Sequence, residues 1–297
     1  MSAGDGVTAV TANGLEFGYL QAGQPGAPLA LCLHGFPDSA RTWRHLLPEL
    51  ADQGYHAVAP FLRGYAPTQL PADGSYQVGA LAADAVALHD AFGADERAVI
   101  IGHDWGAIAT YAAIAFAPDR WRRAVTIAVP PLACVASGFF DYRQLKRSFY
   151  IFLFQTPLAE AAVGAGDLAF IDELWRDWAP GYDGAADAAR AKDCLREPDR
   201  LAAAIGYYRA MLDPSLHLPR YAPEQAAANA GRAGCPVLYL HGTADDCLGA
   251  DLVSGATQYL PPGSRLELVD GASHFLHLER PAQTAATVLS WLSSGAE

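Results

Sequence analysis

One short stretch constrains the fold of this chain more than any other, the run Val99–Ala107, which reads VIIGHDWGA. It begins as an apolar strand and passes through a sharp turn into a helix of small residues. Gly102 and Gly106 lack Cβ atoms, so the strand and the helix can pack closely behind a strained turn that exposes the side chain of Asp104. This spacing predicts that Asp104 is a nucleophile. The alternative is that Asp104 caps the helix, because Asp is favoured at that position.

The rest of the chain alternates between strand-like and helix-like segments. Residues 8–22 are predicted to form a hairpin with Asn13-Gly14 at its turn. Such alternation indicates a parallel sheet covered by helices on both faces. Further strands are expected at 29–33, 55–59, 99–103, 124–129, 236–241 and 265–269, and helices after Ser39 and at 77–92, 105–117 and 281–292.

The alternation stops at residue 131, where an aromatic-rich, helix-like segment begins. It resumes only at residue 236, with the strand Pro236–His241. We therefore expect residues 1–131 and 221–297 to form one α/β core, and residues 132–220 to be a helical cap inserted into it. Ligands bind at the carboxyl ends of the strands in open α/β sheets, and a cap is expected over that edge.

Two more reactive groups follow predicted strands near the end of the chain. The strand at 236–241 leads into Gly242-Thr243-Ala244-Asp245-Asp246, and the strand at 265–269 leads to His274. An imidazole beside a nucleophile-derived ester can activate water, and a buried carboxylate fixes its tautomer. Asp245 has the Gly-x-x-Asp offset and is the preferred acid, whereas Asp246 could simply cap the next turn. The structural alternative for His274 is a helix-capping or core histidine.

Composition excludes several kinds of partner. The chain has 297 residues with a net charge of −12, which argues against nucleic acid and anionic membrane surfaces as partners. It has no uninterrupted apolar run long enough for a membrane span, and its first ten residues do not resemble a secretory signal. The five cysteines are odd in number and scattered, as is typical of reduced thiols. We expect a cytoplasmic protein, either a monomer or a homodimer.

These motifs together resemble the α/β-hydrolase superfamily and, within it, the soluble epoxide hydrolases. The resemblance rests on His34-Gly35-Phe36-Pro37, Gly102-His103-Asp104-Trp105-Gly106 and His274-Phe275, and it covers nearly the whole chain. It implies a mostly parallel eight-stranded sheet with helices on both faces and an inserted helical cap. It also implies an oxyanion hole from the backbone N–H groups of Phe36 and Trp105, with a cis Phe36–Pro37 bond.

An aspartate in place of serine changes the expected chemistry. A carboxylate attacks saturated carbon and forms an alkyl ester on the enzyme, as happens in epoxide opening and halide displacement. Opening an epoxide leaves an alkoxide, which needs an acidic hydrogen-bond donor such as a phenol. The resemblance places this pair of donors at Tyr150, in Phe149–Gln155, and at Tyr208, in Gly206–Arg209. Tyr207 is the fallback for the second position, and the alternative is that these aromatic residues are only cap core.

The sequence thus favours an epoxide hydrolase that converts an epoxide to a vicinal diol. The ester on Asp104 would be hydrolysed by water that the His274–Asp245 pair activates. The second candidate is a haloalkane dehalogenase, because those enzymes also carry Asp-Trp-Gly and use the indole of the residue at Trp105 to hold halide. They need another donor, and Trp175 or Trp178 could supply it. Fluoroacetate dehalogenases carry Arg after the nucleophile, so Trp105 disfavours a charged haloacid substrate.

A third possibility is a non-catalytic small-molecule binder on the same fold. A pure binder would not need a nucleophile, a base and an acid together, and this distinguishes it from the enzyme. His274-x-x-His277 has a spacing that metals can use, but no Asp, Glu or Cys cluster is evident beside it, so no metal is predicted. No phosphate-binding or dinucleotide motif is visible, and no organic cofactor is expected. Arg63-Gly64-Tyr65 is interpreted as a structural loop.

Overall fold

The computed structural model describes residues 6–231 and 234–294. At its centre is an eight-stranded sheet. The strand order is β1-β2-β4-β3-β5-β6-β7-β8. Strand β2 runs antiparallel to both neighbours, and every other neighbouring pair is parallel, which confirms the predicted mostly parallel sheet. The strands are β1 (Thr8–Ala12), β2 (Leu15–Ala22), β3 (Leu29–Leu33), β4 (His56–Pro60), β5 (Val99–His103), β6 (Arg123–Ile127), β7 (Val237–Gly242) and β8 (Arg265–Val269).

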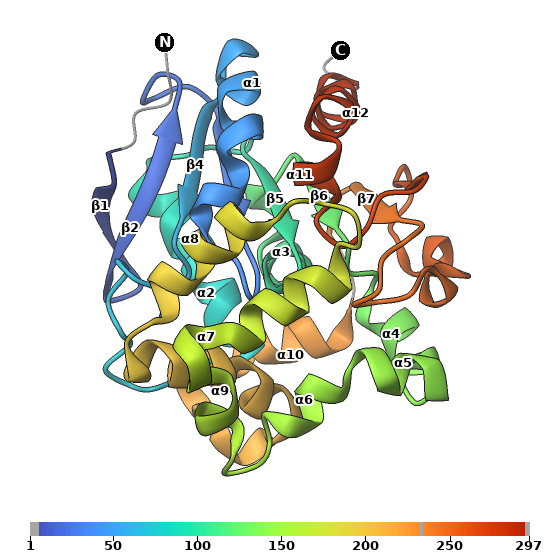
Figure 1. Ribbon diagram of the computed structural model, residues 1–297. Helices are drawn as coiled ribbons and strands as arrows, with labels where there is room; N and C mark the ends of the chain where they lie inside the picture. The colour runs from blue at the N-terminus through green and yellow to red at the C-terminus, as the bar shows by residue number, and fades with distance from the viewer. Residues whose placement is uncertain (1–5, 232–233, 295–297) are drawn as a thin grey trace.

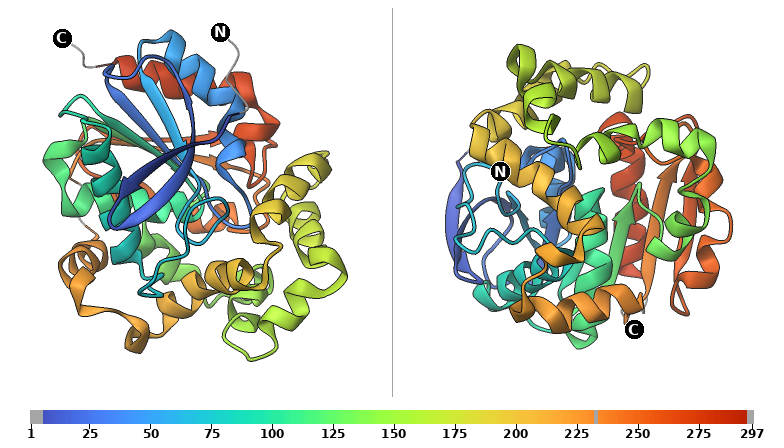
Figure 2. Two further views of the ribbon diagram at one scale, coloured as in Figure 1. Left: turned by 90° about the vertical axis from the view of Figure 1, so that its left-hand side faces the viewer. Right: turned by 90° about the horizontal axis from the view of Figure 1, so that it is seen from below.

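The central strands are mostly apolar because both of their faces are covered. Every residue of β3, β4, β5 and β7 is buried, as expected of parallel strands between two helical layers. On one face α2 (Val78–Ala91), α3 (Trp105–Phe116) and α10 (Ala222–Ala230) pack together, and on the other α1 (Leu46–Asp52) packs against α12 (Pro281–Ser293) (Figure 2). The predicted hairpin is confirmed, with Ala12 opposite Leu15 across the Asn13-Gly14 turn.

The helix predicted after Ser39 differs from expectation in its first turns. Residues Ala40–His45 form a 3₁₀ segment, and α1 begins only at Leu46. Pro48 explains this boundary, because its nitrogen cannot donate to the carbonyl of Arg44 and proline is tolerated only in the first turn of an α-helix. Ser39 caps the segment as predicted, since its hydroxyl accepts a hydrogen bond from the Arg41 N–H.

A long helical segment separates β6 from β7 in the sequence. It contains α4 (Leu132–Gly138), α5 (Tyr142–Arg147), α6 (Phe149–Leu153), α7 (Ala159–Trp178), α8 (Ala185–Leu195) and α9 (Pro198–Leu212). These helices gather on one side of the molecule, away from both termini (Figure 1). We propose that residues 132–220 form the cap, and that residues 1–131 and 221–297 form the core.

Two further features bear on the sequence expectations. Within residues 6–231 and 234–294, no helix combines the length and the apolar character that crossing a bilayer requires. All five cysteines are buried free thiols.

Candidate active site

The turn between β5 and α3 places Asp104 in a backbone conformation that residues other than glycine rarely adopt. Its φ is 53° and its ψ is −119°, and its side chain makes no capping hydrogen bond to α3, which argues against the capping interpretation. The flanking glycines are required by space. A Cβ atom on Gly102 would lie 2.0 Å from the Gly106 carbonyl oxygen, and one on Gly106 would lie 2.0 Å from the Leu33 oxygen. The turn therefore holds the Asp104 carboxylate at the carboxyl end of β5.

His274 and Asp245 lie beside this carboxylate. The His274 Nε2 atom is 3.6 Å from Asp104 Oδ2, and its Nδ1 atom is 3.0 Å from Asp245 Oδ2. The loop after β7 fixes the other oxygen of Asp245, which accepts hydrogen bonds from the N–H groups of Cys247 and Leu248 at 2.8 and 2.9 Å. Asp246 is instead exposed and pairs with Arg147. Of the two candidate acids, the structure brings Asp245 to the histidine.

Electrostatics favour a charged His274 beside an unreacted Asp104. Burial would lower the pKa of the His274 imidazole, but Asp245 and Asp104 outweigh this effect and raise that pKa to about 10. Burial also acts to raise the pKa of the Asp245 carboxyl, yet His274 and the loop hydrogen bonds hold it below its usual value. Asp245 can therefore remain ionised and orient the ring through Nδ1.

Backbone donors lie on the other side of the Asp104 carboxylate. The Phe36 N–H donates to Asp104 Oδ1 at 2.7 Å. Trp105 is the first residue of α3, where N–H groups have no partner within the helix. The predicted cis peptide bond between Phe36 and Pro37 is present. Gly35 permits the close approach, since a Cβ atom there would lie 2.2 Å from Asp104 Oδ1. An anion developing at Oδ1 would thus face at least one preorganised N–H donor.

Two helices of the proposed cap bring a pair of phenol groups to the same cavity as Asp104. Tyr150 from α6 and Tyr208 from α9 are almost fully buried, with ring centroids 5.5 Å apart. The Tyr208 hydroxyl has no hydrogen-bond partner in the described part of the chain. Burial, followed by nearby groups including Asp104, raises the pKa of both phenols well above the usual value, so both are donors at neutral pH. The fallback residue Tyr207 lies elsewhere, with its hydroxyl bonded to the Arg63 carbonyl oxygen at 2.8 Å.

An apolar cavity of about 310 Å³ lies beside Asp104 and the two phenols. Asp104, Trp105, Tyr150 and Tyr208 line it. Its other walls are hydrophobic apart from one thiol, and they come from both the core and the cap: Ile108, Val129, Leu132, Val135, Ala136, Phe139, Phe140, Ile151, Met211, Leu212, Cys247 and Leu248. The arrangement suits an apolar molecule that presents one electrophilic carbon to a carboxylate and one oxygen to a phenol.

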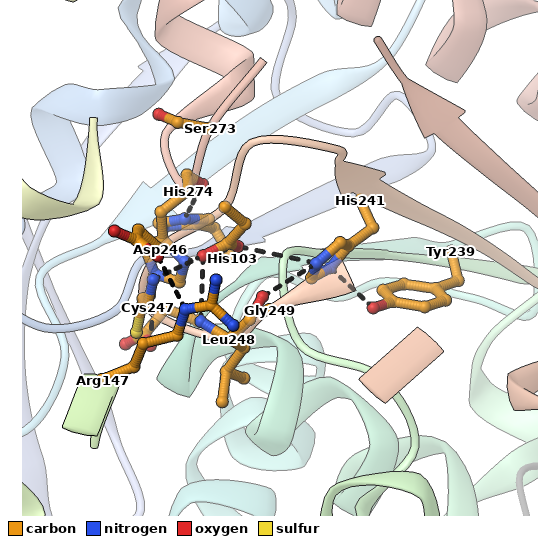
Figure 3. Close-up of polar contacts among 12 residues, drawn as sticks. His103, Arg147, Tyr239, His241, Asp246, Cys247, Leu248, Gly249, Ser273 and His274 are labelled. Carbon is orange, nitrogen blue, oxygen red and sulfur yellow. Dashed lines mark hydrogen bonds and ion pairs between the residues drawn. The ribbon is translucent and has the colours of Figure 1, made fainter. Parts of the chain in front are cut away.

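The loop after Asp245 was missed by the sequence reasoning. Cys247 lines the cavity, and its Sγ atom is 3.6 Å from the Tyr150 hydroxyl. His241 supports the same loop by bonding to the Leu248 carbonyl oxygen and to the Tyr239 hydroxyl. Figure 3 shows the two His241 contacts, with His103 beside His274 and Arg147 reaching Asp246. The only sequence signal for Cys247 was its position two residues after the predicted acid.

Neither cap tryptophan lines the cavity. The Trp175 indole N–H donates to the Pro37 carbonyl oxygen at 2.9 Å, and the ring stacks on Phe275. Trp178 packs against Tyr150 and His274. The arrangement therefore gives no support to either tryptophan as a halide donor.

Two other sequence interpretations have different outcomes. Arg63 is buried and forms a two-point ion pair with Asp84, as expected of a structural loop. His277 was expected to have no Asp, Glu or Cys cluster beside it; in the structure a single carboxylate, that of Asp38, and the ring of His103 have ligand atoms within 4.8 Å of one on His277. Asp38 and His103 are far from His277 in the sequence, so its local spacing could not reveal this group. The absence of a metal stays a prediction.

Comparison with known proteins places this geometry in a family. Residues 30–287 match the model of the alpha/beta hydrolase family. Epoxide hydrolase A of Mycobacterium tuberculosis is 34% identical, over 96% of this chain and 96% of that protein. Epoxide hydrolase 2 of Siraitia grosvenorii is 30% identical, over 96% of this chain and 97% of that protein. The crystal structure of Epoxide Hydrolase A from Mycobacterium thermoresistibile superimposes with a TM-score of 0.81 at 28% identity, covering 97% of this chain and 98% of that chain. The chain belongs to the alpha/beta hydrolase family and, within it, to the group of the epoxide hydrolases.

Proposed function

We propose that this protein hydrolyses epoxides to vicinal diols through a covalent ester on Asp104. The observation that carries the proposal is that a carboxylate of the core and two phenols of the cap line the same apolar cavity. A carboxylate with an Asp–His pair lies on the core side, and two buried phenols, one with an unpartnered hydroxyl, lie on the cap side. This is the donor–nucleophile arrangement that opening a strained ether needs.

In the first step, one Asp104 oxygen attacks an epoxide carbon and the carbon–oxygen bond of the ring breaks. Asp104 Oδ2 is the oxygen left free for this attack, because Oδ1 accepts the Phe36 N–H. The ring oxygen leaves as an alkoxide and takes a proton from a phenol of Tyr150 or Tyr208. No base is required, because a carboxylate is already ionised at neutral pH. The product is an alkyl ester that carries a free hydroxyl group.

In the second step, water attacks the carbonyl carbon of that ester. Ester formation removes the Asp104 charge, which is one of the causes that hold the proton on His274. His274 can then lose its proton, which restores the phenol that reacted in the first step. The neutral imidazole accepts a proton from the attacking water, while Asp245 keeps the ring in place. The anion that forms at Oδ1 faces the Phe36 N–H. When the ester bond breaks, the departing alkoxide takes the proton of the new Asp104 carboxylic acid, which releases the diol and restores the carboxylate.

The other candidates find less support. A dehalogenase would share the Asp104 ester, but it has no use for the two facing phenols, and the Trp175 N–H that could bind halide is already occupied. A non-catalytic binder has no need of the ordered Asp245–His274–Asp104 arrangement.

A substrate screen tests the function directly. Purified protein is incubated with aromatic and aliphatic epoxides and with haloalkanes, and diol and halide are measured separately. The proposal expects diol from at least one apolar epoxide and little halide from the haloalkanes. Halide release without diol formation would favour the dehalogenase, and turnover of neither class would favour the binder.

We also propose that the protein works in the cytoplasm on a small apolar epoxide, as a monomer or a homodimer, without nucleic acid or a membrane as partner. The buried free thiols of its five cysteines support a reducing compartment.

A further inference from the structure

Cys247 links the core of the candidate active site to the cap. Its N–H donates to Asp245 Oδ1 at 2.8 Å, and its carbonyl oxygen accepts a hydrogen bond from Gln144 Nε2 of α5 at 2.9 Å. Gln144 also accepts the Gly249 N–H at 3.1 Å, so one buried cap amide holds both ends of this short segment. The backbone of Cys247 is thereby held by Asp245 of the core and by Gln144 of the cap.

The side chain of Cys247 faces the cavity from this fixed backbone. It is 1% exposed, lines the cavity, and places Sγ 3.6 Å from the Tyr150 hydroxyl. Burial, and then the charges of Asp245 and Asp104, raise the pKa of the Cys247 thiol well above its usual value. A protonated thiol is a poor nucleophile, so it can share a cavity with an electrophile without competing with Asp104.

The two phenols consequently differ in the free protein. The Tyr208 hydroxyl has no partner in residues 6–231 and 234–294, whereas the Tyr150 hydroxyl has the Cys247 sulfur. A thiol is a weak hydrogen-bonding partner. It can orient a phenol while leaving it free to turn toward a stronger acceptor, such as an epoxide oxygen.

We propose that Cys247 is a positioning residue for Tyr150. Its sulfur holds the hydroxyl toward the cavity before the substrate arrives, and releases it when the ring oxygen binds. The inference rests on the proposed function. It adds that the rate of the first step, alkyl-ester formation, depends on a residue in the loop after Asp245. The second step, ester hydrolysis, does not use Tyr150 and should not respond.

Single-turnover experiments can separate these steps. Enzyme in excess is mixed with an epoxide that the wild-type protein hydrolyses, the reaction is quenched at intervals, and ester adduct and diol are measured by mass spectrometry. Cys247→Ala should slow ester formation about fivefold, as expected when one neutral hydrogen bond is lost. Cys247→Ser keeps a hydrogen-bonding atom and should restore most of the rate. Ester hydrolysis should be unchanged in both variants.

Two controls separate positioning from general stability. Cys235 is a buried thiol that does not line the cavity, and Cys235→Ser should leave both steps at the wild-type rate. In a Tyr150→Phe background, Cys247→Ala should have no further effect, because the hydroxyl that it orients is gone. The inference is overturned if Cys247→Ala leaves ester formation unchanged, slows both steps equally, or acts just as strongly without the Tyr150 hydroxyl. Failure of the proposed function looks different, since the wild-type protein would then form no diol.

Discussion

At the scale of the residue, the candidate site depends on what each side chain has left to donate or accept. Asp104 Oδ1 accepts a hydrogen bond from the Phe36 N–H, and His274 Nδ1 is hydrogen-bonded to Asp245. His274 Nε2 and the Tyr208 hydroxyl have no hydrogen-bond partner in the described residues, and Asp104 Oδ2 has only the 3.6 Å ion-pair contact with His274 Nε2. These are the atoms that the two proposed steps use.

The two cap phenols can be tested by removing their hydroxyl groups. Tyr150→Phe and Tyr208→Phe should each slow ester formation by a factor on the order of 100 to 1,000, by analogy with the loss of one oxyanion-hole donor. The double variant should form no measurable ester while its near-ultraviolet circular dichroism stays native. Tyr207→Phe is the matched control, because that hydroxyl bonds to the Arg63 carbonyl oxygen. Wild-type turnover by the double variant would contradict the epoxide assignment.

The charge state of His274 predicts different pH profiles for the two steps. The neutral imidazole accepts a proton from water, so the rate of ester hydrolysis should rise with pH. It should level off below the value of about 10 to which the pKa of His274 is raised in the free protein, because the ester has lost the Asp104 charge. Ester formation needs no base and should be nearly flat between about pH 6 and about pH 9. Rapid-quench measurements of both rates provide the check, and a hydrolysis rate that falls with pH would contradict this role.

Local motifs predicted the residues that lie at strand ends, and they failed where distant segments meet. Asp104, Asp245 and His274 each follow a recognisable strand, and the geometry of parallel strands brings them to one edge. No local sequence pattern links Cys247 to Tyr150, because their contact depends on how the cap packs against the loop after Asp245. The same reason hid the grouping of Asp38 and His103 with His277.

At the scale of the element, the decisive unit is the strand β5, the turn at Asp104 and the helix α3. The strained backbone at Asp104 persists because the glycines on either side allow the strand and the helix to pack without a gap. The sequence therefore predicted this element well. Element types in the core were also well predicted, since apolar runs and turn residues mark them. The 3₁₀ start before α1 was missed because a single proline within a helical pattern determined it.

A methyl group placed at Gly102 tests this unit. Gly102→Ala would bring Cβ within 2.0 Å of the Gly106 carbonyl oxygen, so the strand and the helix must separate. We expect it to lower the free energy of unfolding by about 3 kcal/mol or more, as other strongly strained substitutions do. Gly6→Ala, with open space around the new atom, should change it by less than about 0.5 kcal/mol. Urea denaturation followed by circular dichroism measures both, and equal stability of the two variants would contradict the packing argument.

At the scale of the whole molecule, the cap and the core complete one site between them. In the proposed mechanism the core supplies the nucleophile, the base and the acid, whereas the proposed cap supplies both phenols and much of the apolar wall of the cavity. We therefore expect contacts between the two parts to affect catalysis as well as stability. Trp175 of α7 is one of them, because its N–H donates to Pro37, next to the oxyanion donor Phe36.

This contact predicts a measurable loss of stability. Trp175→Phe leaves the Pro37 carbonyl oxygen without its donor and should cost about 1 kcal/mol more than the same change at a tryptophan with no such bond. Trp43 is that control, since it is equally buried and its indole nitrogen has no partner in the described residues. Chemical denaturation of both variants gives the difference, and a larger loss at Trp43 would argue against the Trp175 hydrogen bond as a tie between cap and core.

The central claim is that water attacks the ester of Asp104 and not the epoxide itself. The most direct measurement is one turnover of wild-type enzyme, in excess over epoxide, in water enriched in oxygen-18. The diol from that turnover should contain no heavy oxygen, and digestion should place one heavy atom on the carboxylate of the peptide that holds Asp104. Heavy oxygen should reach the diol only in later turnovers. A first-turnover diol that carries the full label, with none on Asp104, would mean direct attack by water and would contradict the two-step mechanism.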